Sequence, residues 1–309
     1  MPSKTVALTG ASGFVGGHVL THLLTAGHRV RALERQPDRF HPPIADATLR
    51  AVKGDLFDNN ALAELLRGAD AVIHIVGIIA ERPTRGQTFE RIHVQATANL
   101  LSAAQHAGVK RWVHMSALGT RPDALSHYHR TTWKAECAVR ESGLAHTIFR
   151  PSIIHGPDGE FMELVKGFWC KRFPPFVPYF GAGPFGKGGG GRLQPVYVED
   201  VARCFTEAVT NEKTLDETYP LGGPDRYTWP QLYEAVRTHL PSARNKKVVA
   251  VPAWYAKLIA GLPGVPFNED QVIMSQEDSI CETGKIEHHF GFKPARFEEA
   301  LAQYANEIR

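Results

Sequence analysis

The segment YHRTTWK, residues 128–134, brings a tyrosine and a lysine close together on a predicted helix, residues 126–142. Such a pair can pass a proton to or from an oxygen atom, because the ammonium group lowers the tyrosine pKa from roughly 10 toward neutrality. A four-residue spacing places the two side chains only about 40° apart around the helix. That position holds Thr132, whereas Lys134 lies about 120° away from Tyr128. We therefore expect Lys134 to point toward another surface and Tyr128 to stay protonated; a relay through Lys134 itself is the alternative.

The elements that must position this helix alternate along the first half of the chain. Apolar runs predict strands at 5–10, 28–35, 49–55, 70–77, 110–117 and 145–151. Amphipathic segments predict a helix that stops at Gly27 and further helices at 60–68, 88–107 and 126–142. This order predicts an α/β fold with a doubly wound parallel sheet that is covered on both faces. Ligands are expected at the carboxyl ends of its strands.

The sequence TGASGFVGG joins the first predicted strand to the first helix and contains Gly10, Gly13 and Gly16. Gly10 permits a tight turn, Gly13 lets the backbone approach a diphosphate, and Gly16 lets helix and strand pack closely. The diphosphate would lie on the positive N-terminal end of the helix. We therefore expect a dinucleotide here; a glycine-rich turn without a ligand is the alternative.

Further segments resemble the extended and atypical short-chain dehydrogenase/reductase superfamily, which includes NAD-dependent epimerases and dehydratases. The matching segments are, in order, GDLFD (54–58), HIVG (74–77), HVQATANLLSAA, HMSALG, FRPSIIHGP and PVYVEDVA. The resemblance implies a Rossmann fold, a nicotinamide dinucleotide and a substrate with a carbonyl or hydroxyl group. It implies nucleotide contacts at Ser12, Phe14, Val15, Asp55, Leu56, Val76, Gly77, Asn99, Pro151 and Ile153. It implies catalytic positions at Ser116, at Tyr128 and at Thr132, where the family keeps its lysine.

A narrower resemblance leaves two functions open. The segments YHRTTWKAE, FRPSIIHGPDGEFM and PFNEDQVIMSQEDS resemble the group typified by the nucleotide-binding accessory subunit of respiratory complex I. The retained Ser116 and Tyr128 favour an oxidoreductase or epimerase with an impaired proton relay. Thr132 favours a non-catalytic, nucleotide-bound subunit of a larger assembly.

The chain is expected to divide into two parts, because the alternation breaks after Pro151. We predict a dinucleotide-binding domain at 1–155, completed by 193–222, and a smaller, mixed substrate lobe at 156–192 and 223–309, which ends in a helix near 297–308. Residues 173–191 hold four prolines and seven glycines, which exclude a long helix or a central strand. This segment is either a flap over the cleft or a disordered surface loop.

The choice between NAD(H) and NADP(H) depends on the end of the second strand, where Glu34 precedes Arg35. A carboxylate accepts hydrogen bonds from the ribose 2′-hydroxyl of NAD(H), whereas an arginine binds the 2′-phosphate of NADP(H). In the group that the chain resembles, arginine at the position of Arg35 goes with NADP(H). Alternate strand residues face opposite sides, so we expect Glu34 to point away. NADP(H) is therefore favoured, and NAD(H) is the alternative.

The composition and net charge limit which binding partners and metal sites are expected. The net charge is +3, and no run of Lys and Arg forms a stripe, so nucleic acid is not expected as a partner. The four cysteines lack a CxxC pair, and His127 and His129 do not share a helix face, so no metal site is expected. We expect His74 to be a buried core residue with hydrogen-bond partners, and His288 and His289 to lie in an exposed turn.

Free thiols and a strand that begins by Thr5 predict a cytoplasmic location. The apolar segment 254–267 predicts packing within the small lobe, with a protein-assembly or weak membrane-surface contact as the alternative.

Overall fold

The computed structural model describes residues 3–183, 190–262 and 265–308. Seven of the described strands form one parallel sheet in the order β10-β6-β5-β4-β1-β2-β3. These strands are β1 (Thr5–Thr9), β2 (Arg29–Glu34), β3 (Leu49–Lys53), β4 (Ala71–His74), β5 (Arg111–Met115), β6 (Ala145–Pro151) and β10 (Glu217–Leu221). The predicted doubly wound α/β fold is therefore confirmed.

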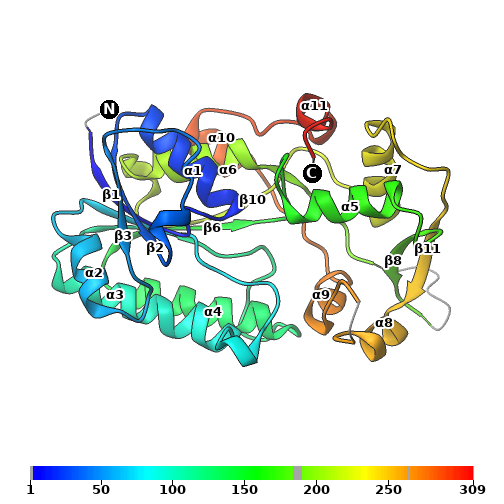
Figure 1. Ribbon diagram of the computed structural model, residues 1–309, viewed down its shortest axis with the longest axis horizontal. Helices are drawn as coiled ribbons and strands as arrows, with labels where there is room; N and C mark the ends of the chain where they lie inside the picture. Colours follow the sequence, from blue (N-terminus) through cyan, green and yellow to red (C-terminus); the bar gives the residue numbers. More distant parts are fainter. Residues whose placement is uncertain (1–2, 184–189, 263–264, 309) are drawn as a thin grey trace.

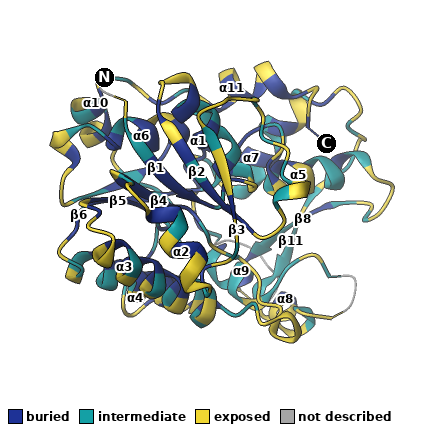
Figure 2. Cartoon of the chain, turned by 60° about the vertical axis from the view of Figure 1, so that its left-hand side comes forward, coloured by how far each residue is buried: buried dark blue, intermediate teal, exposed yellow. Residues whose placement is uncertain are grey.

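Helices cover both faces of this sheet (Figure 1). One face carries α1 (Phe14–Thr25), α6 (Val198–Ala208) and α10 (Gly284–Phe290), and the other carries α2 (Asn59–Leu66), α3 (Ala96–His106) and α4 (His127–Glu141). The helices bury apolar stripes against the strands, and two core clusters result, one on each face. Figure 2 shows the central strands buried between the two helical layers. Burial on both faces explains why the central strands β1 and β4 are apolar runs, whereas β2 and β3, nearer the sheet edge, carry exposed charged residues.

Four details differ from the prediction. β4 ends at His74, and the apolar residues that follow form a loop along the cavity described below. The helix expected over 88–107 begins as a π-helical turn, η3 (Glu90–Gln95), before α3. The edge strand β10 was not predicted, because only Tyr219 and Leu221 of its five residues are buried. The exposed turn expected at His288 and His289 is wrong: both lie in α10, where His289 Nδ1 is 2.6 Å from the hydroxyl of Tyr219.

A second group of elements lies beyond the carboxyl ends of the main strands. It contains α5 (Glu160–Cys170), β8 (Val177–Gly181), α7 (Trp229–Thr238), β11 (Val248–Pro252), α8 (Ala253–Ile259), α9 (Glu269–Met274) and α11 (Phe297–Tyr304), with the short pair β7 (Ile154–His155) and β9 (Val196–Tyr197) at its border. β8 and β11 pair in parallel, and α5, α7 and α11 share a third core cluster. Residues 184–189 of the predicted flap and 263–264 of the apolar segment lie outside the described residues. The division into two lobes stays a prediction.

A titratable cluster joins α1 to α6 on the outer face of the sheet. His18 Nδ1 and His22 Nε2 each lie 2.6 Å from a carboxylate oxygen of Glu199, and His18 Nε2 lies 3.2 Å from Asp158. Hydrogen bonds with His18 and His22 lower the pKa of Glu199 to about 2. Burial lowers the pKa of His18, but hydrogen bonds with Glu199 and Asp158 outweigh this effect and raise it.

We expect Glu199→Gln to destabilise the protein most between about pH 4.5 and 6.5. The depressed pKa of Glu199 stabilises the fold above its ordinary value of 4.5, and this contribution disappears as the pH falls toward 2. The raised pKa of His18 stabilises the fold below 6.5, and this contribution disappears as the pH rises through the folded-state pKa. Since the carboxylate is partly exposed, we expect a fall in Tm of about 2 °C at pH 5.5 and less at pH 8.5, measured by differential scanning calorimetry. Glu207→Gln, which breaks only the Arg203 pair in α6, is the control. An equal loss at both pH values would contradict the assignment.

Candidate nucleotide and active site

The glycine loop between β1 and α1 forms a tight turn. Gly10 has φ +87°, and the Gly13 N–H donates to the Gly10 carbonyl at 3.0 Å. A Cβ on Gly16 would lie 1.8 Å from that same carbonyl oxygen, so only glycine allows this approach of helix to turn. α1 begins after Gly13 with no acidic residue in its first turn, which leaves its positive end available for an anion. The loop therefore has the geometry that a dinucleotide diphosphate requires.

A cavity of about 1300 Å³ opens in front of this loop, at the carboxyl ends of the parallel strands. Most of the predicted site residues line it. They are Gly10, Ser12, Gly13, Phe14, Val15, Gly16, Glu34, Arg35, Asp55, Leu56, Val76, Gly77, Ser116, Tyr128, Pro151 and Ile153. Asn99 and Thr132 do not line this cavity. The structure thus brings the glycine loop and the tyrosine together, and the role of each residue in binding stays a prediction.

The loop after β3, residues 54–58, is held in place by contacts within the chain. Asn99 Nδ2 donates to the Leu56 carbonyl at 3.1 Å, so Asn99 supports the loop from behind. The Asp55 carboxylate accepts from the Phe57 N–H at 2.8 Å, which fixes the turn after β3. The Arg91 guanidinium lies 3.8 Å above the Phe57 ring, and both residues line the cavity. The prediction missed Arg91, because it follows no motif and comes from the π-helical turn.

Glu34 faces the cavity, which corrects the expectation that it points away. It lies at the end of β2, is only 6% exposed and has Ser12 of the glycine loop as a neighbour. Burial raises the pKa of Glu34, and hydrogen bonds with Ser12 partly offset this rise. Its Oε1 atom is buried without a hydrogen-bond partner. Such an acceptor fits a ribose hydroxyl of a dinucleotide. Arg35 is exposed at the same edge of the cavity.

Thr132 lies beside a small void behind Tyr128. The void measures about 40 Å³ and is lined by the side chains of Tyr128, Thr132, Ser116, His93 and His114, among others. The Thr132 hydroxyl donates to the Tyr128 carbonyl at 2.8 Å, so its proton is used by the helix backbone. A void of this size has room for water, which needs roughly 10–15 Å³. A longer side chain at position 132 would enter this void.

No cation among the described residues of this void can activate the tyrosine. Burial raises the pKa of Tyr128 to about 12. Burial also lowers the pKa of His93 to about 4 and that of His114 to about 3, so both rings are neutral near pH 7. Lys134 instead pairs with Glu90 at 3.1 Å on the surface, which confirms that it points elsewhere. Tyr128 is therefore a hydrogen-bond donor rather than a base.

Ser116 has a partner that the sequence analysis missed. Its hydroxyl donates to Glu136 Oε1, and the Glu136 side chain is fully buried. Arg150 Nε and Nη2 also donate to Glu136 at 2.7 and 2.6 Å, and Arg140 bonds to it as well. The i, i+4 series Thr132, Glu136 and Arg140 on α4 is the signal that could have revealed this network. Because its proton is engaged by the carboxylate, Ser116 is a weaker donor toward a substrate oxygen.

The structure also shows the surroundings of His74 and allows a search for metal-binding groups and membrane-spanning helices. His74 lies 2.7 Å from Thr9 Oγ1 and 3.1 Å from Thr97 Oγ1, which confirms a satisfied core residue. Within residues 3–183, 190–262 and 265–308, no group of three or more His, Cys, Asp or Glu side chains could hold a metal ion. No helix among those residues combines the length and apolar character needed to cross a bilayer.

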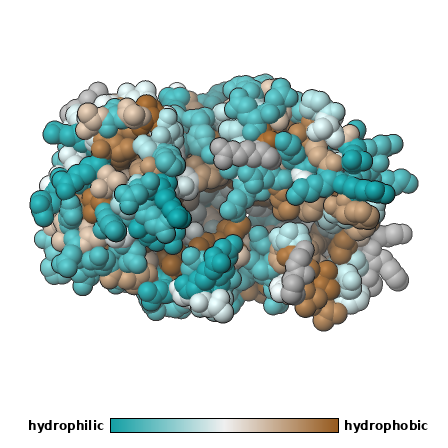
Figure 3. Space-filling view, in the orientation of Figure 1, coloured by the Kyte–Doolittle hydropathy of each residue, from teal (hydrophilic) through white to brown (hydrophobic). Residues whose placement is uncertain are grey.

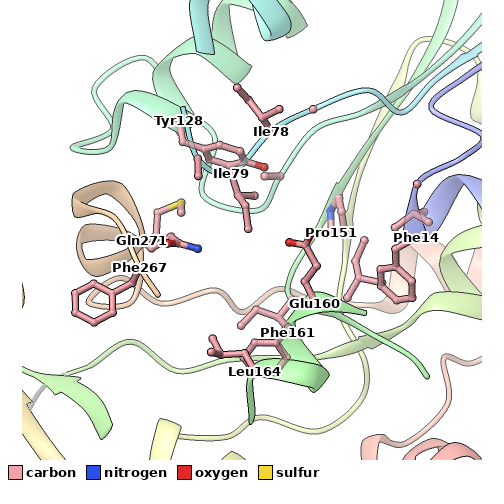
Figure 4. A pocket seen from close by; sticks show the side chains of 18 of the residues that line it. Phe14, Ile78, Ile79, Tyr128, Pro151, Glu160, Phe161, Leu164, Phe267 and Gln271 are labelled. Carbon is pink, nitrogen blue, oxygen red and sulfur yellow. The ribbon is translucent and has the colours of Figure 1, made fainter. Parts of the chain in front are cut away.

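The cavity wall opposite the glycine loop was not predicted residue by residue. Tyr128 and Ile79 face Phe267 and Gln271 across the cavity, while α5 contributes the floor (Figure 4). The loop after β4 is closed by a bridge between Arg82 and Gln87. Within the described part of the predicted flap, five residues also line the cavity: Pro174, Phe176, Pro178, Tyr179 and Phe180. Irregular segments carry no periodic hydrophobic pattern. The sequence therefore predicted a lobe in this region but not which of its residues line the cavity.

Comparison with known proteins identifies the family. The family described as NAD(P)H-binding matches residues 10–166. A ceramide reductase from Caulobacter vibrioides is 31% identical over 249 residues, which are 79% of this chain and 72% of that protein. The mitochondrial NADH dehydrogenase [ubiquinone] 1 alpha subcomplex subunit 9 from Arabidopsis thaliana is 30% identical over 73% of this chain and 55% of that protein. The structure of the Bordetella bronchiseptica enzyme WbmH in complex with NAD⁺ superposes with a TM-score of 0.73 at 20% identity, over 100% and 99% of the two chains. The chain therefore belongs to the NAD(P)H-binding family.

Proposed function

We propose that the protein is an NAD(P)(H)-dependent oxidoreductase or epimerase for a carbonyl or hydroxyl compound, and that its turnover is slow. The observation that carries the proposal is that Ser116 and Tyr128 line the same cavity as the glycine loop. A bound nicotinamide would supply or accept the hydride at the substrate carbon. Tyr128 would donate a hydrogen bond, and then a proton, to the carbonyl oxygen. Its high pKa and the missing relay lysine slow this proton transfer.

A second function is supported by Thr132 itself. Without a cation beside Tyr128, the chain suits a non-catalytic, nucleotide-bound subunit that stabilises or regulates a larger assembly. The relatives include both a ceramide reductase and complex I subunits. An assembly or weak membrane-surface contact would use the outer face of α8, where Trp254 and Leu258 are 60% and 72% exposed. The cytoplasmic location also stays a proposal.

The two functions differ in a turnover assay. The nucleotide-loaded protein is mixed with a panel of aldehydes and ketones, and loss of nicotinamide absorbance is followed. The oxidoreductase proposal expects slow but measurable turnover that Tyr128→Phe abolishes. Tight nucleotide binding without turnover for any carbonyl would favour the accessory subunit.

For the nucleotide itself we propose NADP(H), with Arg35 binding the 2′-phosphate from the cavity edge. Arg35→Ala should weaken NADPH binding at least tenfold and change NADH binding less than twofold, because a charge-assisted hydrogen bond contributes roughly 1.5–3 kcal/mol and about 1.4 kcal/mol corresponds to a factor of ten. Glu34→Gln should strengthen NADPH binding, because the buried carboxylate repels a phosphate. Isothermal titration calorimetry measures both, with the exposed Arg39→Ala as a control outside the cavity. If the wild type prefers NADH and Glu34→Gln weakens it, then Glu34 selects the ribose hydroxyl and the NADP(H) proposal is wrong.

A further inference from the structure

The part of the cavity that is formed by residues after Pro151 has a largely apolar lining. Its walls come from α5, β8, α8, α9 and the segment before α9. Representative side chains are Phe161, Leu164, Phe180, Ile259, Phe267 and Met274. The rings of Phe180 and Phe267 meet edge to face with centroids 4.7 Å apart. We call this part of the cavity the apolar chamber; Figure 4 shows its α5 wall facing the Tyr128 side.

Positive charge is confined to the other part of the cavity. The arginines that line the cavity are Arg35, Arg82, Arg85 and Arg91, which come from the segment after β2 and from the segment between β4 and α3. Among the described residues from 151 onward, no lysine, arginine or histidine lines it. The carboxylate of Glu277 is paired with Arg121, which lies outside the lining, at 2.8 Å.

The helix ends that border the chamber also disfavour anions. α5 begins with Glu160 and has Glu163 in its first turn, and α9 begins with Glu269 and Asp270. Carboxylates in these positions occupy the positive helix ends. A diphosphate placed in the chamber would be desolvated with no opposite charge, which is unfavourable. A nucleoside diphosphate sugar is therefore a poor fit for the chamber.

The apolar surface continues from the chamber to the outside through α8. Tyr255 and Ile259 line the cavity, while Trp254 and Leu258 face outward. Apolar side chains gather on the surface over α8 at the lower right of Figure 3. A single short helix with apolar residues on both faces thus separates the chamber from solvent at this end.

We propose that the substrate of this site carries a long, uncharged hydrocarbon chain, which occupies the chamber while its carbonyl group lies at Tyr128. This inference rests on the proposed function. The hydride from the nicotinamide would go to the carbonyl carbon and the proton to the oxygen, so the ketone becomes an alcohol as NADPH becomes NADP⁺. Each buried methylene contributes about 0.8 kcal/mol, which is about a fourfold gain in affinity.

Binding of 2-alkanones of increasing length tests the inference. Calorimetry on the full chain, with and without NADPH, should show affinity rising up to about fourfold per methylene from 2-butanone to 2-tridecanone, and no binding of UDP-glucose. Leu164→Arg, which places a cation in the chamber wall, should weaken 2-tridecanone binding at least tenfold and leave NADPH binding unchanged. Leu215→Arg is the matched control, because Leu215 is similarly exposed, at 41% against 37% for Leu164, and lies outside the cavity.

The outcomes separate the two proposals. Affinity that is independent of chain length, or tighter binding of UDP-glucose than of 2-tridecanone, would overturn the inference even if NADPH binds. Failure to bind any nicotinamide dinucleotide would overturn the proposed function. In that case, the affinities of the alkanone series without nucleotide would still show whether the chamber prefers long hydrocarbon chains.

Discussion

Replacing Thr132 with lysine is expected to raise kcat/KM for carbonyl reduction by roughly 10²-fold, because positioned proton transfer contributes about 10²–10⁴-fold to such reactions. The new side chain would start one helical turn after Tyr128, beside the void of about 40 Å³. Its ammonium group would lower the pKa of Tyr128 from about 12 toward neutrality. The rate of alcohol oxidation should then rise with pH, because ionised Tyr128 can accept the proton of the alcohol. Absorbance assays measure the first effect with the carbonyl panel and the second with the corresponding alcohols and oxidised nucleotide.

Thr132→Met provides the control, since it fills the same space without charge. If methionine accelerates turnover as much as lysine does, packing rather than charge limits the wild type. If the wild type already turns over rapidly, the chain has another way to activate Tyr128 and the account of an impaired relay is wrong. If NADPH affinity is equal in all three proteins, differences in turnover reflect the chemical step rather than the fraction of protein that carries cofactor.

Replacing Gly16 with alanine is expected to abolish dinucleotide binding and to destabilise the fold by about 3 kcal/mol, at the upper end of overpacking costs. The added Cβ would lie 1.8 Å from the Gly10 carbonyl oxygen and 2.6 Å from its carbonyl carbon. Both contacts are with backbone, so the turn or the helix must move. Urea unfolding and NADPH calorimetry measure the two effects.

The neighbouring Gly17→Ala is the matched control. Its Cβ would lie 3.7 Å from the Pro43 side chain and 3.9 Å from the Ala11 carbonyl oxygen, and both are ordinary contacts. Alanine in a helix is favoured over glycine by about 1 kcal/mol, so this variant should be as stable as the wild type or more so, and should bind nucleotide normally. Equal behaviour of the two alanine variants would contradict the close approach of α1 to the loop.

The sequence was sufficient for the elements that follow one periodicity. The central strands β1 and β4 are apolar runs, and α1 carries a regular apolar stripe, so the fold and the glycine loop could be predicted. The failures occur where tertiary contacts decide. β10 is a strand because it pairs with β6 at the sheet edge, and Glu34 faces the cavity although its neighbour Arg35 is exposed.

The chemistry of the site was only partly predictable, for a related reason. The helical angle between Tyr128 and Lys134 sufficed to exclude the shifted lysine, because both residues lie on one rigid element. Glu136 reaches Ser116 from a different element, and only the structure shows that the serine proton is engaged. The apolar chamber is assembled from five segments spread over more than 110 residues, from Phe161 to Met274. No local pattern contains that information.

The central claim is that backbone N–H groups at the start of α1 hold a dinucleotide diphosphate, and titration of the wild-type protein with NADPH and NADH tests it most directly. The account predicts a measurable heat of binding, a stoichiometry of one nucleotide per chain and a higher Tm with at least one of the two. Millimolar concentrations that give no heat and leave the Tm unchanged for both nucleotides would contradict it.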